Sequence, residues 1–78
     1  MVNLFLLKDL AKLSGYSVYT VKYYLKIGLI CEQGRSPETN YRYFNDENVQ
    51  DLAFIRSLRR QGKSIEDIRN ILQARNKK

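Results

Sequence analysis

The sequence predicts a mainly α-helical domain of four helices with a small two-stranded β wing. Three observations predict it. Apolar residues recur at helical spacing in four segments. A glycine followed two residues later by a serine separates the helices of each pair, at Gly15 with Ser17 and at Gly62 with Ser64. Between the pairs lies the aromatic segment Tyr41–Phe44, whose composition favours a strand.

The first helix pair is predicted over residues 8–14 and about 18–27, after an extended lead-in at Leu4–Leu6. Gly15 suits the end of the first helix, because glycine adopts the left-handed backbone conformation freely. Ser17 suits the start of the second, because its hydroxyl can accept a hydrogen bond from a free backbone N–H of the first turn.

The predicted helix 18–27 has two unlike faces. At about 100° per residue, one face holds Val18, Val21 and Leu25 with Tyr24 beside them, and we expect it to join the core. The opposite face is aromatic and basic, with Tyr19, Lys22, Tyr23 and Lys26. Such a face can be an ordinary solvated surface or a binding surface.

The wing is predicted from two strands joined by a turn. Leu29–Cys31 is the expected first strand, with Cys31 as a small buried residue. Residues 32–40 are rich in turn formers, and Tyr41–Phe44 is the expected returning strand. A pair of strands this short needs the helices for support.

The second helix pair begins at Asn45, a favourable N-cap, and its first helix is expected to run to about Gln61. Ser64 with Asp67 resembles a capping box, and the fourth helix is predicted from Ile65 to about Gln73. The domain is therefore placed at residues 1–75, with a basic C-terminal tail at 76–78.

The composition excludes several classes of protein. The chain has no histidine and one cysteine, which excludes Ser-His-Asp and Cys-His catalysis, an internal disulfide and a structural zinc site. With only 78 residues to enclose a pocket, we expect no enzyme, metal or cofactor. No apolar run reaches the roughly 18 residues of a membrane span, and Leu4–Leu7 is too short for a signal peptide. We expect a cytoplasmic, nucleoid-associated protein with no membrane partner.

The charge points to nucleic acid. Fourteen Lys and Arg residues against eight Asp and Glu residues give a net charge of +6 and a pI of about 9.7. Charge alone is also consistent with solubility. A helix–turn–helix unit followed by a β wing, however, is a geometry that docks on DNA.

Several ordered motifs resemble one family. Leu10–Val18, then Val21–Tyr24, then Gly28–Ile30 resemble the pattern LAxxxGVS…IRYYxxxGL of the MerR-family DNA-binding domain. The wing segment Pro37–Phe44 is most similar to that of the multidrug-sensing members, and Val49–Ile71 resembles the second helix pair. The chain departs from the pattern at three positions, with Lys22 for Arg, Phe44 for Tyr and Cys31 for Pro.

The resemblance implies sequence-specific binding of double-stranded DNA by a transcriptional regulator. In this family, dimers bind a pseudo-palindromic promoter operator and act on RNA polymerase indirectly, by distorting the DNA between its recognition elements. The family's dimerisation helix and effector domain would follow after the last residue of this sequence, so we expect a monomer or a weak homodimer here.

The predicted recognition helix, about 18–27, enters the major groove, with its N-terminal residues nearest the bases. The full predicted DNA-binding set is Ser17, Tyr19, Thr20, Lys22, Tyr23, Tyr24, Lys26, Arg35, Tyr41, Arg42, Tyr43, Arg60 and Lys63. Tyr24 is included because the resemblance places its counterpart near the DNA backbone. The wing residues are expected at the flanking backbone, and Arg60 and Lys63 at a second wing outside the half-site, in a cluster with Arg56 and Arg59.

Two other functions are consistent with the same pattern. A small excisionase-like or architectural DNA-binding protein would bind adjacent direct repeats rather than an inverted repeat. A helical protein-interaction module would dock its basic face on an acidic partner and show no affinity for DNA.

Overall fold

The computed structural model describes residues 4–76 and contains four helices and two short strands. The elements in order are α1 (Leu7–Ser14), α2 (Val18–Lys26), β1 (Gly34–Arg35), β2 (Arg42–Tyr43), α3 (Asp46–Arg60) and α4 (Ile65–Asn76). The strands pair antiparallel, with Gly34 opposite Tyr43 and Arg35 opposite Arg42. The predicted four helices and two-stranded wing are confirmed.

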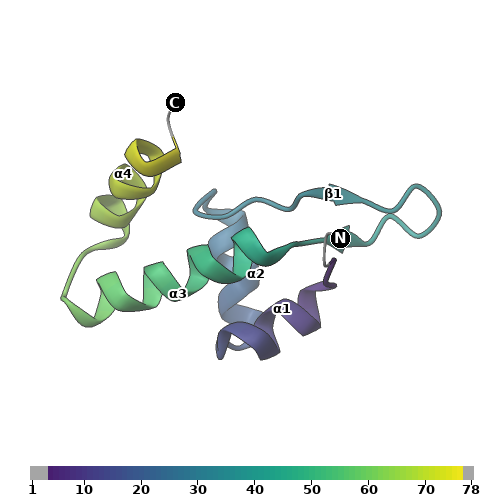
Figure 1. Ribbon diagram of the computed structural model, residues 1–78, viewed down its shortest axis with the longest axis horizontal. Coiled ribbons are helices and arrows are strands. Elements are labelled where there is room, and N and C mark those ends of the chain that lie inside the picture. Colours follow the sequence, from purple (N-terminus) through teal and green to yellow (C-terminus); the bar gives the residue numbers. More distant parts are fainter. Residues whose placement is uncertain (1–3, 77–78) are drawn as a thin grey trace.

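Helix α3 runs along the long axis of the molecule, with α1 and α4 on opposite sides of it and α2 crossing behind it (Figure 1). One apolar core joins these elements. Its completely buried side chains include Leu10, Val21, Phe44, Leu52, Ile55 and Ile68. Because every helix contributes to this one core, the position of each depends on the others.

The expected helix ends are present. Gly15 has a φ of +78° and its N–H donates to the carbonyl of Ala11, which closes α1. The Ser17 hydroxyl accepts from the Thr20 N–H at 3.1 Å, and the Asn45 side chain accepts from the first turn of α3. Ser64 Oγ accepts from the Asp67 N–H at 3.1 Å at the start of α4.

Asn48 ties the wing to α3, a role that was not predicted from the sequence. It is 2% exposed, the one buried polar side chain among the described residues. Its Nδ2 donates to the Cys31 carbonyl at 2.9 Å. Its Oδ1 accepts from the Asn45 N–H at 3.0 Å and from Gln33 Nε2 at 3.1 Å. One amide thus holds the helix start and the segment that leads into β1.

The predicted strand at Leu29–Cys31 is wrong. The N–H groups of Leu29 and Ile30 donate to the Tyr24 carbonyl, so these residues close the end of α2. Their side chains are buried, which explains the apolar pattern without a strand. The first strand instead begins at Gly34, and Cys31 is exposed rather than buried.

The exposure of Val18 and the length of α4 also differ from expectation. Val18 is 39% exposed, because it lies in the first turn of α2 at the edge of the core. Helix α4 continues to Asn76, since Arg75 pairs with Asp51 at 3.6 Å and its guanidinium lies 4.7 Å from the Phe54 ring centroid. Of the predicted tail 76–78, residue 76 belongs to α4 and the other two lie outside the described residues.

Replacing Asn48 with Ala should lower the free energy of unfolding by about 2 kcal/mol, because buried hydrogen-bonding groups lose their partner. Urea denaturation followed by circular dichroism measures this. Gln50→Ala, at an exposed position of the same helix, is the matched control and should change stability little. Equal effects of the two substitutions would contradict the role given to Asn48.

Candidate nucleic-acid interface

Helix α2 has one buried face and one exposed face, as its sequence predicts. Val21 is 0% exposed and Tyr24 is 6% exposed. On the other side Tyr19 is 82% exposed and Tyr23 is 46% exposed, and Lys22 and Lys26 are exposed with them. The core contacts of the first face therefore fix the direction in which the aromatic and basic face points.

The N-terminus of α2 is open to an anion. Ser17 is exposed, and its hydroxyl also donates to Thr20 Oγ1 at 3.0 Å. In the described part of the chain, α2 alone of the helices has no acidic residue in its first turn, where α1, α3 and α4 carry Asp or Glu. The positive end of its helix dipole is thus not neutralised from within, which favours a phosphate or another acceptor there.

Tyr24 is a core residue in this structure. Its ring packs edge-on against Tyr16, with centroids 5.5 Å apart and planes at 86°. Burial, and to a smaller extent the neighbouring Tyr24, raise the pKa of Tyr16 to about 12. This phenol therefore keeps its proton throughout the physiological range. With 6% of its surface exposed, Tyr24 offers little to DNA compared with Tyr19 and Tyr23.

The two wing arginines share one carboxylate. Arg35 Nε lies 3.2 Å and Arg42 Nε lies 3.8 Å from Glu32 Oε2. A hydrogen bond from its own backbone, and to a smaller extent the two arginines, hold the pKa of Glu32 below its ordinary value. Glu32 is therefore ionised at neutral pH, and it orients both guanidinium groups in exposed pairs that a phosphate can replace.

The two wing tyrosines, both predicted to bind DNA, differ in exposure. Tyr41 is 63% exposed, whereas Tyr43 is half-buried. The Tyr43 phenol lies so close to Gly34 that a Cβ at that position would collide with it. Tyr43 therefore packs across the strand pair, and Tyr41 is left facing solvent.

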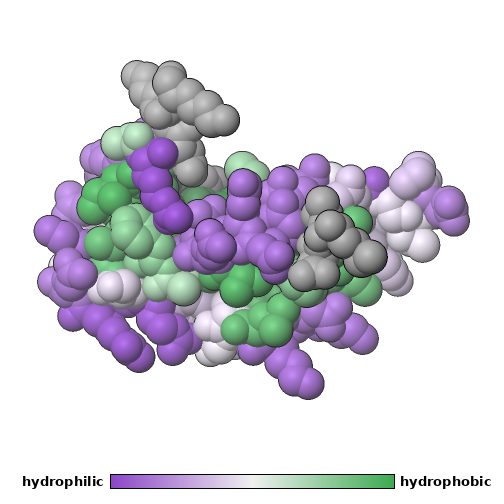
Figure 2. All heavy atoms as spheres, in the orientation of Figure 1, coloured by the Kyte–Doolittle hydropathy of each residue, from purple (hydrophilic) through white to green (hydrophobic). Residues whose placement is uncertain are grey.

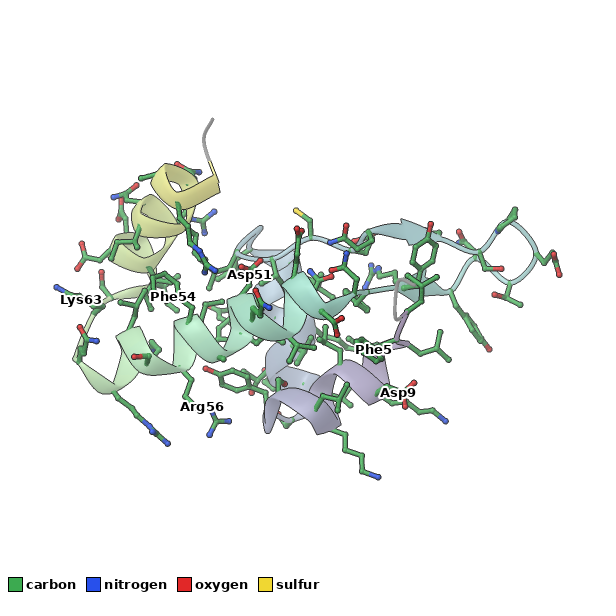
Figure 3. The ribbon with its side chains drawn as sticks, in the orientation of Figure 1. Phe5, Asp9, Asp51, Phe54, Arg56 and Lys63 are labelled. Carbon is green, nitrogen blue, oxygen red and sulfur yellow. The ribbon has the colours of Figure 1, made fainter. Side chains whose placement is uncertain are left out.

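The turn between α3 and α4 exposes the predicted second basic group. Arg60 and Lys63 are both exposed beside Gly62, and Arg59 Nη1 donates to the Lys63 carbonyl at 3.2 Å. Arg56, one turn earlier, does not join them. Its guanidinium lies against the α1–α2 turn, where Nη2 is 3.4 Å from the Ser14 carbonyl (Figure 3).

The β1–β2 turn and the α3–α4 turn lie at opposite ends of a molecule that measures 39 × 29 × 24 Å, with α2 between them (Figure 1). Hydrophilic side chains cover α3 and the α3–α4 turn in Figure 2, with apolar surface beside α4. The arrangement thus has a central helix with an exposed face, flanked on one side by the wing, whose strands carry Arg35 and Arg42, and on the other by the basic α3–α4 turn.

A cleft of about 640 Å³ lies elsewhere, between α4, the start of α3 and the segment that leads into β1. Its lining mixes both charges, with Glu47 and Asp51 beside Arg69 and Arg75. Within residues 4–76, no three His, Cys, Asp or Glu side chains gather in a way that could hold a metal ion. No described helix is long and apolar enough to cross a membrane.

A helix pair whose second helix exposes a basic, aromatic face, followed by a β wing, defines a winged helix–turn–helix domain. Residues 5–75 match the family model described as MerR HTH family regulatory protein. The chain belongs to this family, whose members are transcriptional regulators rather than enzymes. Membership of the MerR family, expected from the motifs in Leu10–Ile30 and the wing, is confirmed.

The relatives include regulators of different kinds. Heavy metal-dependent transcription regulator 2 of Rhizobium meliloti is 39% identical over 82% of this chain and 43% of its own length. The multidrug-efflux transporter 1 regulator of Bacillus subtilis is 33% identical over 78% of this chain and 22% of its own length. Overall identity thus does not single out the multidrug-sensing members, and the chain spans about half or less of these curated relatives.

Two solved structures have the same fold. A MerR family regulator from Bacillus cereus superposes with a TM-score of 0.86 at 24% identity, over 97% of this chain and 56% of that one. HiNmlR, described as a MerR family regulator lacking the sensor domain and bound to promoter DNA, superposes with a TM-score of 0.82 at 29% identity. That match covers 92% of this chain and 54% of HiNmlR.

Gly15→Ala should destabilise the domain by about 1–2 kcal/mol, because an alanine resists the left-handed conformation at φ +78°. The new methyl group would also meet Arg56 Nη2 at 3.0 Å. Gly62→Ala is the matched control, since it has φ +85° and no atom within 4 Å of the added Cβ. Urea denaturation should show the larger loss for Gly15→Ala, and a larger loss for Gly62→Ala would contradict this packing.

Proposed function

We propose that this chain binds double-stranded DNA sequence-specifically, as the DNA-reading domain of a MerR-type transcriptional regulator. The observation that carries the proposal is the two-sided construction of α2. Its buried face is fixed in the core, while Tyr19, Tyr23 and the two lysines are exposed. An α-helix presented in this way fits the major groove of B-DNA.

Within this proposal the start of α2 reads bases. Ser17, Tyr19 and Thr20 lie in or next to its first turn, which enters the groove most deeply. Lys22, Tyr23 and Lys26 lie further along the same face and contact phosphates. The unneutralised helix N-terminus adds to the attraction for the DNA backbone.

The wing and the α3–α4 turn extend the contact to both sides of the groove. Arg35, Tyr41 and Arg42 contact the backbone flanking the half-site, with phosphate replacing the shared Glu32 carboxylate. Tyr43 supports this wing from within, by packing on Gly34. Arg60 and Lys63 contact phosphates on the other side.

The relatives support a role at promoters. HiNmlR, which matches 92% of this chain, is described as bound to promoter DNA. We propose that one copy of this domain reads one operator half-site and that a homodimer reads the pair, with RNA polymerase affected indirectly through the DNA. A nucleoid-associated, cytoplasmic location accompanies this role.

Selection from a pool of random duplexes, with the purified chain at low salt, tests the proposal. Enrichment of a short half-site, alone or as an inverted pair, is the expected result. Enrichment of adjacent direct repeats would favour the excisionase-like alternative. No enrichment and no salt-sensitive binding would overturn DNA recognition and favour an acidic protein partner.

Replacing Arg42 with Gln should weaken binding to the selected duplex and make it less dependent on salt. Contacts to about five phosphates predict a slope of log K against log salt near −4.5, and each lost phosphate contact makes the slope about 0.9 less negative. Fluorescence anisotropy at several salt concentrations measures both quantities.

Arg75→Gln is the matched control for Arg42→Gln. It removes the same charge from α4, where Arg75 pairs with Asp51 and lies outside the proposed interface. Its slope should equal that of the unmodified chain. A larger change in slope for Arg75→Gln than for Arg42→Gln would indicate that DNA binds beside α4 rather than at the wing, and would contradict the proposed interface.

A further inference from the structure

We propose that Arg56 is a positioning residue for α2, one that sets the accuracy of base reading from the side of α3 without touching DNA. The inference rests on the proposed function and adds a determinant of specificity outside the DNA-contacting face. It follows from three contacts that Arg56 makes at the α1–α2 turn.

The first two contacts hold the turn itself. Arg56 Nη2 donates to the carbonyl of Ser14, the last residue of α1, at 3.4 Å. The guanidinium carbon lies 4.7 Å from the centroid of the Tyr16 ring, so the cation also rests on the aromatic face of the turn. Ser14 ends α1 and Tyr16 lies in the turn, so both partners belong to the segment that leads into α2.

The third contact is the close approach at Gly15. A Cβ at this position would lie 3.0 Å from Arg56 Nη2, so the missing side chain leaves the space that the guanidinium occupies. Tyr16 in turn packs edge-on against Tyr24 on the buried face of α2. A continuous path of contacts therefore runs from α3 through Arg56 and Tyr16 to α2.

The surroundings of the Arg56 Nε atom argue against a role in stability alone, although the side chain as a whole is half-buried. Its Nε is buried and has no hydrogen-bond partner in the described structure. A buried donor without a partner is unfavourable, and an apolar side chain of similar volume would avoid it. The guanidinium is the group that reaches the Ser14 carbonyl and covers the Tyr16 ring together.

The same geometry argues against a phosphate contact. Arg56 is directed to the turn, whereas Arg60, one helical turn later, is exposed. Figure 3 shows the labelled Arg56 side chain leaving α3 toward the α1–α2 turn, far from Lys63 in the α3–α4 turn. Arg60 therefore provides a matched control on the same helix with the same charge.

The experiment compares Arg56→Met with Arg60→Met, on the selected duplex and on a random-sequence duplex, over a range of salt. For Arg56→Met we expect the ratio of specific to non-specific affinity to fall about tenfold, as for one lost base contact, with an unchanged salt slope. For Arg60→Met we expect the slope to become about 0.9 less negative and the ratio to stay the same.

Arg56→Lys separates position from charge. Lysine keeps the charge but lacks the planar fork that bonds the carbonyl while covering the ring, so specificity should fall as for Arg56→Met. It also replaces Arg56→Met if that variant does not fold, as judged by circular dichroism. Retained specificity in a folded Arg56 variant, or a slope change like that of Arg60→Met, would overturn the inference.

Hydrogen exchange in the free protein tests the same link without DNA. Arg56 variants should exchange faster at amides of the α1–α2 turn and the first turn of α2, with little change in the wing. Unchanged exchange at the turn would overturn the inference even if DNA binding is present. Absence of any binding by the unmodified chain would instead overturn the proposed function.

Discussion

The burial of Val21 and Tyr24 in the common core is the constraint on which the rest of the structure depends. Helix α2 has nine residues, too few for a helix that is stable alone in water. Its conformation and direction come from the core that it shares with α1 and α3. In a 78-residue chain, which buries only about 60% of its unfolded surface, few side chains supply that stability. The same contacts that fold α2 therefore aim its exposed face.

The electrostatic design of the interface differs from one element to the next. On α2 the lysines are exposed and the helix N-terminus carries no acidic residue, so both can attract an anion without first breaking an ion pair. In the wing, Arg35 and Arg42 are held by Glu32, and a phosphate must replace that carboxylate. Arg56 is half-buried, and its guanidinium is directed to the Ser14 carbonyl in the α1–α2 turn. The net charge of +6 thus overstates how much positive charge is free to meet DNA.

The sequence predicts most of this fold, because helical periodicity, Gly15, Ser17 and Asn45 act locally. It fails where long-range contacts decide. Leu29 and Ile30 have the apolar pattern of a strand, but their N–H groups close α2 and their side chains fill the core. The length of α4 depends on contacts of Arg75 with α3 that no local pattern reveals.

The candidate site divides in the same way. The exposed face of α2 follows from spacing alone, and the exposure of Tyr41, Arg60 and Lys63 follows from their place in turns or at the wing. The roles of Asn48 and Arg56 could not be predicted, because both act across the fold on carbonyl groups far away in the sequence. A polar residue inside an otherwise apolar helical stripe was the available signal for Asn48.

Titration of the ¹⁵N-labelled chain with the selected duplex, followed by amide chemical shifts, tests directly whether α2 and the two elements beside it form the DNA-binding surface. We expect the chemical shifts to change in three segments, residues 17–26, 35–43 and 60–63. Amides that line the cleft beside α4, such as those of Glu47 and Gln73, should stay unchanged. Changes centred on that cleft, with none along α2, would show that α2 is not the DNA-binding element.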